Sequence, residues 1–154
     1  MKDHLTRLRE IELFSCLKDD ALDSVARLAS EEHHPRGATI FQHGDAGDKL
    51  YLILEGKVRI SRNVAGMGEE ALAILGPGQL FGEMALLDES ARSADARAHE
   101  TCQLLSIAKD GFDDLLFMNK DLAYEVLWSM VRMLAGRLRQ TNDKLTLLSA
   151  SGKF

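Results

Sequence analysis

The chain has 154 residues, of which 45% are apolar and 28% are charged, a composition typical of a soluble globular domain. Its formal net charge of −5 disfavours direct binding to nucleic acid, which usually needs a basic surplus. No apolar run approaches the ~18 residues of a membrane span, and the start, MKDHLTRLRE, lacks the apolar core of a signal peptide. Cys16 and Cys102 are too few and too far apart to form a disulfide framework. We therefore expect a cytoplasmic protein with reduced thiols and no membrane contact.

Apolar residues recur at helical spacing from residue 3 to about residue 32, and this pattern predicts two short helices. Phe14 and Leu17 mark the break between them. Asp19 or Asp20 is placed to cap the second helix. Pro35 then ends the helical stretch, because proline disfavours the helical conformation of the residue before it.

From Ala38 to about Lys109 the apolar period changes toward two, which predicts short strands. The runs are TIFQHGD, LYLILEG, VRISRNV, EALAILG and CQLLSIAK. Each is bounded by glycine or a turn. Strands this close together, with no helices between them, favour a compact antiparallel roll or barrel over a parallel sheet.

After Lys109 the helical period returns and leads into a long helix. One series on it alternates spacings of four and three residues: Leu127, Val131, Leu134, Leu138, Thr141, Leu145 and Leu148. Such a heptad pattern predicts a helix that forms a homodimer, and the alternative is a helix packed on its own domain. Thr141 is the polar exception in the series, and it either sets the register of the dimer or binds a ligand.

The segment FGEMALLDESARSA, residues 81–94, combines groups that suit a phosphorylated sugar. Arg92 offers a cation with the fork geometry that phosphate prefers. A short helical turn beginning near Glu83 would add free backbone N–H groups, and the small Gly82 and Ala85 would allow close approach. Glu83 can accept a hydrogen bond from a sugar hydroxyl. By spacing alone, a solvated loop arginine paired with a nearby acid remains the alternative.

The same segment closely resembles the phosphate-binding cassette of cyclic nucleotide-binding domains, which runs Phe-Gly-Glu, an aliphatic residue, Ala-Leu, a short loop, then Arg, a small residue and Ala. LREIELFSCLKDDALDSVARLA is similar to the N-terminal helices of that family, GDAGDKLYLILEGKVRI is similar to its central strands, and LGPGQLFGE is similar to its approach to the cassette. RLRQTNDKL resembles the dimer helix of bacterial catabolite-activator (Crp/Fnr)-type regulators, and the effector domains of these regulators are the nearest match. The resemblance covers nearly the whole chain.

This resemblance implies a nucleotide site, and it implies a role for each matching position. Glu83 would accept the ribose 2′-hydroxyl, Arg92 would hold the cyclic phosphate, and Thr141 would bond the adenine edge. The full set that it implies is Gly82, Glu83, Met84, Ala85, Arg92, Ser93, Ile60, Ala73, Leu75, Arg137, Thr141 and Asn142.

Within this set the resemblance implies that the cassette residues would hold sugar and phosphate, whereas Ile60, Ala73 and Leu75 would line the sugar and base. Asn142 would reach the base from the partner chain, and Arg137 would lie close by on the same helix. The expected ligand is cAMP, with cGMP open as an alternative, and no cofactor is expected.

Two positions depart from the family pattern, and so does the end of the chain. Ala91 stands where many members have proline, and Asp95 stands where Thr or Ser is common. If Asp95 faces inward, its charge opposes a phosphate; strand alternation cannot decide this without the register. The chain ends soon after Thr141, with no room for the recognition helix of the regulators, so we expect no direct DNA binding. The signal would then be read either by a separate protein partner or by a larger natural protein from which this chain is cut.

The expected architecture is a single cyclic nucleotide-binding domain over residues 1–154. It is mainly β with flanking helices: an antiparallel β-roll or jelly-roll barrel (double-stranded β-helix). Helices occupy residues 1–37, the roll with its cassette occupies 38–109, and helices including the dimer helix occupy 110–150.

Two other functions compete with this interpretation. A cupin-type metalloenzyme would need clustered His and Glu ligands, and the sequence has no His-x-His motif, only the adjacent His33 and His34 among otherwise single histidines. A related sensor fold that binds another ligand, or none, is disfavoured by the presence of both Glu83 and Arg92. We therefore expect a binding module and not an enzyme.

Overall fold

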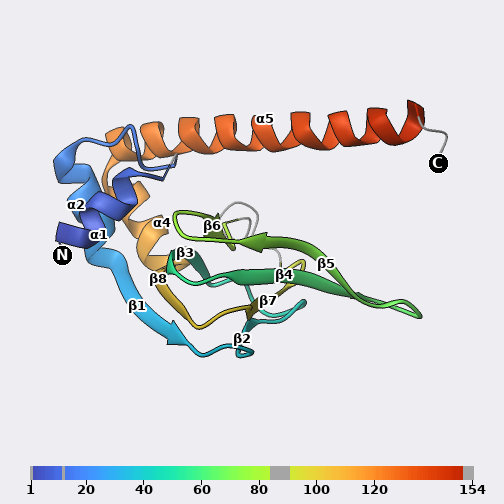
Figure 1. The fold of residues 1–154 in the computed structure, drawn as a ribbon. Coiled ribbons are helices and arrows are strands. Elements are labelled where there is room, and N and C mark those ends of the chain that lie inside the picture. Colours follow the sequence, from blue (N-terminus) through green and yellow to red (C-terminus); the bar gives the residue numbers. More distant parts are fainter. Residues whose placement is uncertain (1, 12, 84–90, 151–154) are drawn as a thin grey trace.

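The computed structural model describes residues 2–11, 13–83 and 91–150 (Figure 1). Helices flank a β-roll at its N-terminal end, and a long C-terminal helix lies across it (Figure 1). The helices are α1 (Lys2–Arg9), α2 (Asp19–Leu28), α4 (Lys109–Met118) and α5 (Lys120–Ala150). The strands are β1 (Ala29–His34), β2 (Thr39–Phe41), β3 (Lys49–Glu55), β4 (Val58–Val64), β5 (Gly68–Leu75), β6 (Leu80–Phe81), β7 (Asp95–Ala98) and β8 (Cys102–Ala108).

Within the described residues the strands form two four-stranded antiparallel sheets, ordered β1-β8-β3-β6 and β2-β7-β4-β5. This confirms the predicted mainly β roll with flanking helices. It also explains why β3 is buried on both faces. Leu50 and Leu52 face the helices, whereas Tyr51 and Ile53 face the interior of the roll, because side chains alternate along a strand.

The N-terminal prediction was wrong for residues 29–32, which lie in β1 and not in a helix. β1 pairs in register with β8, from Ala29 opposite Ile107 to His34 opposite Cys102. This long-range pairing overrides the local helical spacing, as tertiary context often does.

The predicted N-cap of α2 was also wrong. Lys18 occupies the N-cap and makes no side-chain cap bond. Asp20 instead accepts a hydrogen bond from the backbone N–H of Ala21 at 2.9 Å, and Asp19 pairs with Arg9. The break between α1 and α2, by contrast, falls where Phe14 and Leu17 predicted it.

Helix α5 has a buried face and an exposed face. Near its start, Leu122, Val126 and Met130 are buried in the helical core with Phe14 and Phe112. On another face of α5, most of the predicted heptad positions are exposed. Among them, the exposed side chains include Leu127 (51%), Val131 (55%), Leu138 (62%) and Leu145 (47%). No helix in the described part of the chain has the length and hydropathy to cross a bilayer.

Candidate functional site

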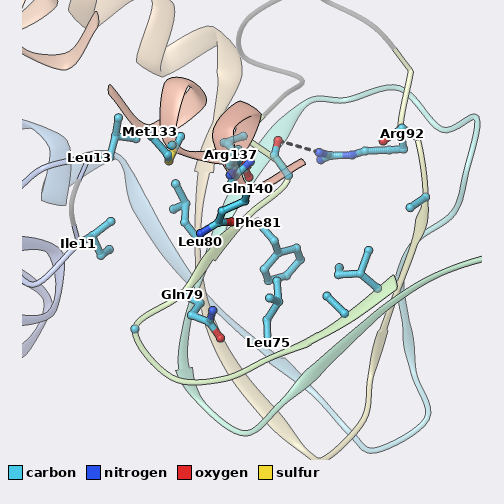
Figure 2. Close-up of a pocket in the computed structure, with 18 of the residues that line it drawn as sticks. Ile11, Leu13, Leu75, Gln79, Leu80, Phe81, Arg92, Met133, Arg137 and Gln140 are labelled. Carbon is cyan, nitrogen blue, oxygen red and sulfur yellow. Dashed lines mark hydrogen bonds and ion pairs between the residues drawn. The ribbon is translucent and has the colours of Figure 1, made fainter. Parts of the chain in front are cut away.

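A cavity of about 920 Å³ lies between the roll and α5 (Figure 2). Its walls come from distant parts of the sequence, which the fold brings together. The lining residues are Ile11, Leu13, Phe41, Ile60, Ala73, Leu75, Gly78–Glu83, Ala91–Ala94, Arg132, Met133, Gly136, Arg137 and Gln140. The cavity is therefore apolar along β4 and β5. Its charged groups are those of Glu83 and Arg92 and the arginines of α5.

Arg92 is the main cation of the roll side of the cavity, and only 5% of it is exposed. Its Nη1 donates to the Gly82 carbonyl at 3.0 Å, and its Nη2 donates to the Lys49 carbonyl at 2.7 Å. The guanidinium also stacks over the Phe41 ring, with its central carbon 4.1 Å from the ring centroid. These contacts fix the side chain in one orientation.

The Nε–H of this buried guanidinium has no hydrogen-bond partner among the described residues. The carboxylate of Asp48 lies 3.9 Å from Nη2, at the edge of ion-pair distance, and is itself 75% exposed. Burial lowers the pKa of Arg92, although nearby Tyr51 and Asp48 raise it in part. An arginine keeps its charge in proteins, so a buried, incompletely paired cation faces the cavity.

Gly82 has a left-handed φ of +78°, and a side chain there would collide with its neighbours. A Cβ would lie 2.8 Å from Nη1 of Arg92 and 3.3 Å from the Lys49 carbonyl oxygen. Glycine is thus needed for the backbone conformation and for the approach of the arginine.

Glu83 lies next in the chain, and only 4% of it is exposed. Its carboxylate is paired with the guanidinium of Arg137 on α5. The Arg137 side chain is 45% exposed, so the carboxylate of the pair is buried whereas its guanidinium partner is accessible to solvent. This contact joins the segment after β6 directly to α5.

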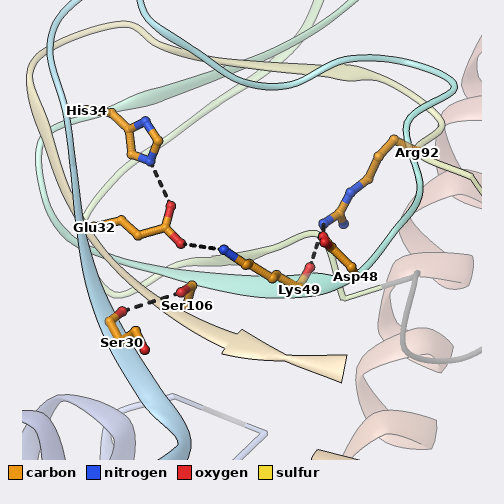
Figure 3. A network of polar contacts seen from close by, with 7 residues as sticks. All are labelled: Ser30, Glu32, His34, Asp48, Lys49, Arg92 and Ser106. Atoms are coloured by element: carbon orange, nitrogen blue, oxygen red, sulfur yellow. Dashed lines mark hydrogen bonds and ion pairs between the residues drawn. The ribbon is translucent and has the colours of Figure 1, made fainter. Parts of the chain in front are cut away.

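A polar network joins β1 to Lys49 of β3, the residue whose carbonyl accepts a hydrogen bond from Arg92 (Figure 3). Lys49 Nζ donates to Glu32 at 3.2 Å, and His34 Nε2 lies 2.9 Å from the other oxygen of that carboxylate. Burial raises the pKa of Glu32, but the hydrogen bonds from His34, Ser106 and Lys49 outweigh it and the net pKa is lowered. Because the Lys49 carbonyl accepts from Arg92, one residue links the network to the arginine.

The structure brings most of the predicted site residues to this cavity. Those that line it are Gly82, Glu83, Arg92, Ser93, Ile60, Ala73, Leu75 and Arg137. Met84 and Ala85, with the helical turn predicted to begin near Glu83, lie outside the described residues. Thr141 and Asn142 are exposed and do not line the cavity of this chain. The Thr141 hydroxyl donates to the Arg137 carbonyl on its own helix at 3.0 Å.

Asp95 does not face the cavity. It begins β7, pairs with Ser61, and accepts a hydrogen bond from the backbone N–H of His43 at 2.7 Å. Its carboxylate is hydrogen-bonded within the roll and does not line the cavity, so it does not oppose an anion beside Arg92.

Sequence reasoning missed several residues of the cavity wall. Ile11 and Leu13 come from the segment after α1, and no local pattern connects them with the cassette. Gly136 and Gln140 had a usable signal, because they lie four residues apart and therefore on one face of α5. The described residues contain no group of three or more His, Cys, Asp or Glu side chains that could hold a metal ion.

Comparisons with known proteins match this geometry. A model described as the cyclic nucleotide-binding domain matches residues 31–119. A Cyclic AMP receptor protein of Thermus thermophilus is 42% identical over 89% of this chain and 62% of its own length. A CRP-like cAMP-activated global transcriptional regulator of Mycobacterium tuberculosis is 31% identical over 86% of this chain and 58% of its own length.

Among solved structures, the N-terminal domain of a transcriptional regulator from Streptomyces coelicolor has a TM-score of 0.78 and 34% identity. The match covers 90% of this chain and 94% of that one. The chain spans less than two thirds of the curated relatives just named. Since the family model covers more than half of the sequence, the chain belongs to the cyclic nucleotide-binding domain family.

Proposed function

We propose that this chain is a regulatory module that binds cAMP in the cavity between the roll and α5. The observation that carries the proposal is the buried Arg92, whose Nε–H has no partner in the described part of the chain and whose side chain lines the cavity. A cyclic phosphate carries one negative charge and acceptor oxygens, so it suits this cation. Ser93 lines the cavity beside the arginine and can donate its hydroxyl to the same group.

The ribose would lie against Glu83. A carboxylate accepts hydrogen bonds and is repelled by phosphate, so Glu83 suits the 2′-hydroxyl, while Arg92 suits the phosphate. In the structure the Glu83 carboxylate is paired with Arg137. A bound ribose must share or replace that contact, which gives the ligand a route to the position of α5.

The proposed output is a shift of α5 coupled to occupancy of the cavity. A ligand shifts such an equilibrium only if it binds one arrangement more tightly than the other. The Glu83–Arg137 pair is the described contact that meets this condition most directly, because it joins the ribose-binding acid to the helix. A protein partner, or another part of a longer chain, would read the shift.

The preference for cAMP over cGMP rests on the relatives and on α5. The relatives described as a Cyclic AMP receptor protein and as cAMP-activated regulators share 42% and 31% identity with this chain. We propose that Thr141 bonds the adenine edge and that Asn142 reaches it from a partner chain. Both are exposed and away from the cavity of a single chain, so this part of the proposal requires the dimer.

We propose that the dimer forms through the outer face of α5. Leu127, Val131, Leu138 and Leu145 place exposed apolar side chains at heptad spacing along this helix. Two copies packed along this seam would bury them, as in a coiled coil. The seam and the cavity wall occupy different faces of α5, so one helix can serve both.

Thermal unfolding with a panel of nucleotides tests the proposed function. A ligand at 100 times its dissociation constant stabilises the folded state by about 2.7 kcal/mol, enough to raise the midpoint by several degrees. We expect this shift with cAMP, a smaller shift with 2′-deoxy-cAMP, which lacks the hydroxyl for Glu83, and none with 5′-AMP at the same concentration. Equal shifts for cAMP and its 2′-deoxy analogue would remove the role of Glu83. No shift with either cyclic nucleotide, cAMP or cGMP, would refute the proposal.

A further inference from the structure

One face of α5 forms the wall of the cavity opposite the roll. It consists of Arg132, Met133, Gly136, Arg137 and Gln140, which recur at helical spacing. Figure 2 labels Met133, Arg137 and Gln140 of this wall, with Arg92 on the far side of the cavity. Gly136 and Gln140 of this face are not among the residues proposed above to contact the phosphate, the ribose or the base.

Gly136 leaves an open notch in the wall. A Cβ added there would meet nothing within 4 Å, although the residue lines the cavity. The backbone is helical at this position, so its conformation does not require glycine. Glycine is among the least favourable residues inside a helix, and alanine would be preferred if only helix stability mattered. The notch therefore leaves room for a group that packs directly on the backbone of α5.

Gln140 lies one helical turn beyond the notch. It is exposed and lines the cavity, so its carboxamide is accessible to a ligand. The group carries an N–H donor pair and a carbonyl acceptor side by side. Such a pair can bond the edge of a purine at two atoms, as glutamine does with adenine in nucleic-acid recognition.

The Glu83–Arg137 contact places this wall beside the sugar. In a nucleotide the base is attached to C1′, next to the carbon that bears the 2′-hydroxyl. A ribose whose 2′-hydroxyl meets Glu83 therefore holds its base near the neighbours of Arg137 on α5. Gly136 precedes Arg137 and Gln140 follows it by three residues, so both lie on the side of the helix that the base would reach.

We propose that Gly136 and Gln140 form the purine subsite of this chain, with the ring packed in the notch at Gly136 and its edge bonded by Gln140. This inference rests on the proposed function. It differs from a subsite in which Thr141 alone contacts the base, because Gly136 and Gln140 both line the cavity of a single chain.

Calorimetric titration of the full chain with cAMP and cGMP, together with thermal unfolding of the free protein, tests this subsite. Gly136→Ala fills the notch: we expect the unfolding midpoint to rise by about 2–4 °C. The cAMP affinity should nevertheless fall about fivefold or more, because an added methyl group overpacks the ring. The matched control is Ala135→Gly, which does not line the cavity and should lower the midpoint without changing affinity.

Two substitutions test Gln140. Gln140→Ala should weaken cAMP binding about fivefold or more, because a bidentate contact is lost. Gln140→Glu should weaken cAMP more than cGMP, since a carboxylate cannot donate to adenine but can accept from N1–H and the 2-amino group of guanine.

The outcomes separate this inference from the proposed function. If the wild-type chain binds cAMP, and Gly136→Ala and Gln140→Ala bind it equally well, the subsite is wrong and the proposed function stands. If wild type binds neither nucleotide, both fail. Lower affinity in Gly136→Ala together with a higher unfolding midpoint supports the subsite, because a purely structural role would not lower affinity as stability rises.

Discussion

The buried carboxylate of Glu83 is paired with the guanidinium of Arg137, so the segment after β6 is joined to the middle of α5 by an ion pair. Only one partner of this pair is buried, and removing the exposed partner leaves a buried acid without its cation. We expect Arg137→Ala to destabilise the free protein by about 1–3 kcal/mol, the penalty for an unsatisfied buried group. Urea unfolding without nucleotide measures this.

The control for this prediction is the double variant Glu83→Gln with Arg137→Ala. It removes the buried charge together with its partner, so it should recover part of the stability lost in Arg137→Ala. If Arg137→Ala unfolds at the same urea concentration as wild type, the ion pair contributes nothing to the link between roll and helix.

A second prediction concerns the glycine under the arginine. Gly82→Ala adds a side chain at a φ of +78° and places its Cβ 2.8 Å from Arg92. The backbone penalty is about 1–2 kcal/mol, and the displaced guanidinium should also weaken nucleotide binding. Gly66→Ala is a matched control, because its φ is +81° and its Cβ would meet nothing within 4 Å. Both variants should lose stability, whereas only Gly82→Ala should lose affinity; an equal affinity in the two would contradict the close approach.

The Glu32 network predicts a pH dependence of stability. The folded-state pKa of Glu32 is lowered, so its contribution is present above the ordinary glutamate pKa of about 4.3 and is lost as pH falls through the folded value. Between pH 6 and pH 3, wild type should therefore lose more unfolding free energy than Glu32→Gln. The exposed Glu55→Gln serves as control and should follow wild type. Parallel losses in wild type and Glu32→Gln would show that the network (Figure 3) does not lower this pKa.

The exposed seam on α5 predicts the oligomeric state. Sedimentation velocity should give twice the chain mass of 17.1 kDa for wild type. Leu138→Glu places a charge in the seam and should give a monomer, because a buried unpaired charge is strongly unfavourable. Thr146→Glu adds the same charge off the seam and should stay dimeric. A wild-type monomer at high concentration would remove the dimer and the role of Asn142.

The grouping of Gly82, Glu83 and Arg92 at one cavity could be predicted from sequence, because the three residues lie close together in one distinctive motif. The long strands could be predicted from their alternation and turns. β1 could not, since its strand state depends on pairing with β8 at the other end of the roll. β6 and β7 are too short to show a period, at Leu80–Phe81 and Asp95–Ala98.

On α5 the sequence showed the heptad seam more clearly than the cavity wall. Thr141 interrupts the seam and is predicted to contact the ligand; in the single chain its hydroxyl donates to the Arg137 carbonyl of its own helix. The wall residues Gly136 and Gln140 carry no distinctive chemistry in sequence. Their spacing of four residues places them on one face of the helix, but only the fold shows that this face lies over the cavity.

Calorimetric titration of wild type and Arg92→Ala with cAMP tests whether Arg92 holds the phosphate of a cyclic nucleotide. A charge-assisted hydrogen bond contributes on the order of 1.5–3 kcal/mol, so we expect wild type to bind cAMP and Arg92→Ala to bind it at least about tenfold more weakly. Circular dichroism of the variant establishes that it is folded. Wild type without a binding signal, or a folded Arg92→Ala with wild-type affinity, would show that Arg92 does not hold a cyclic phosphate.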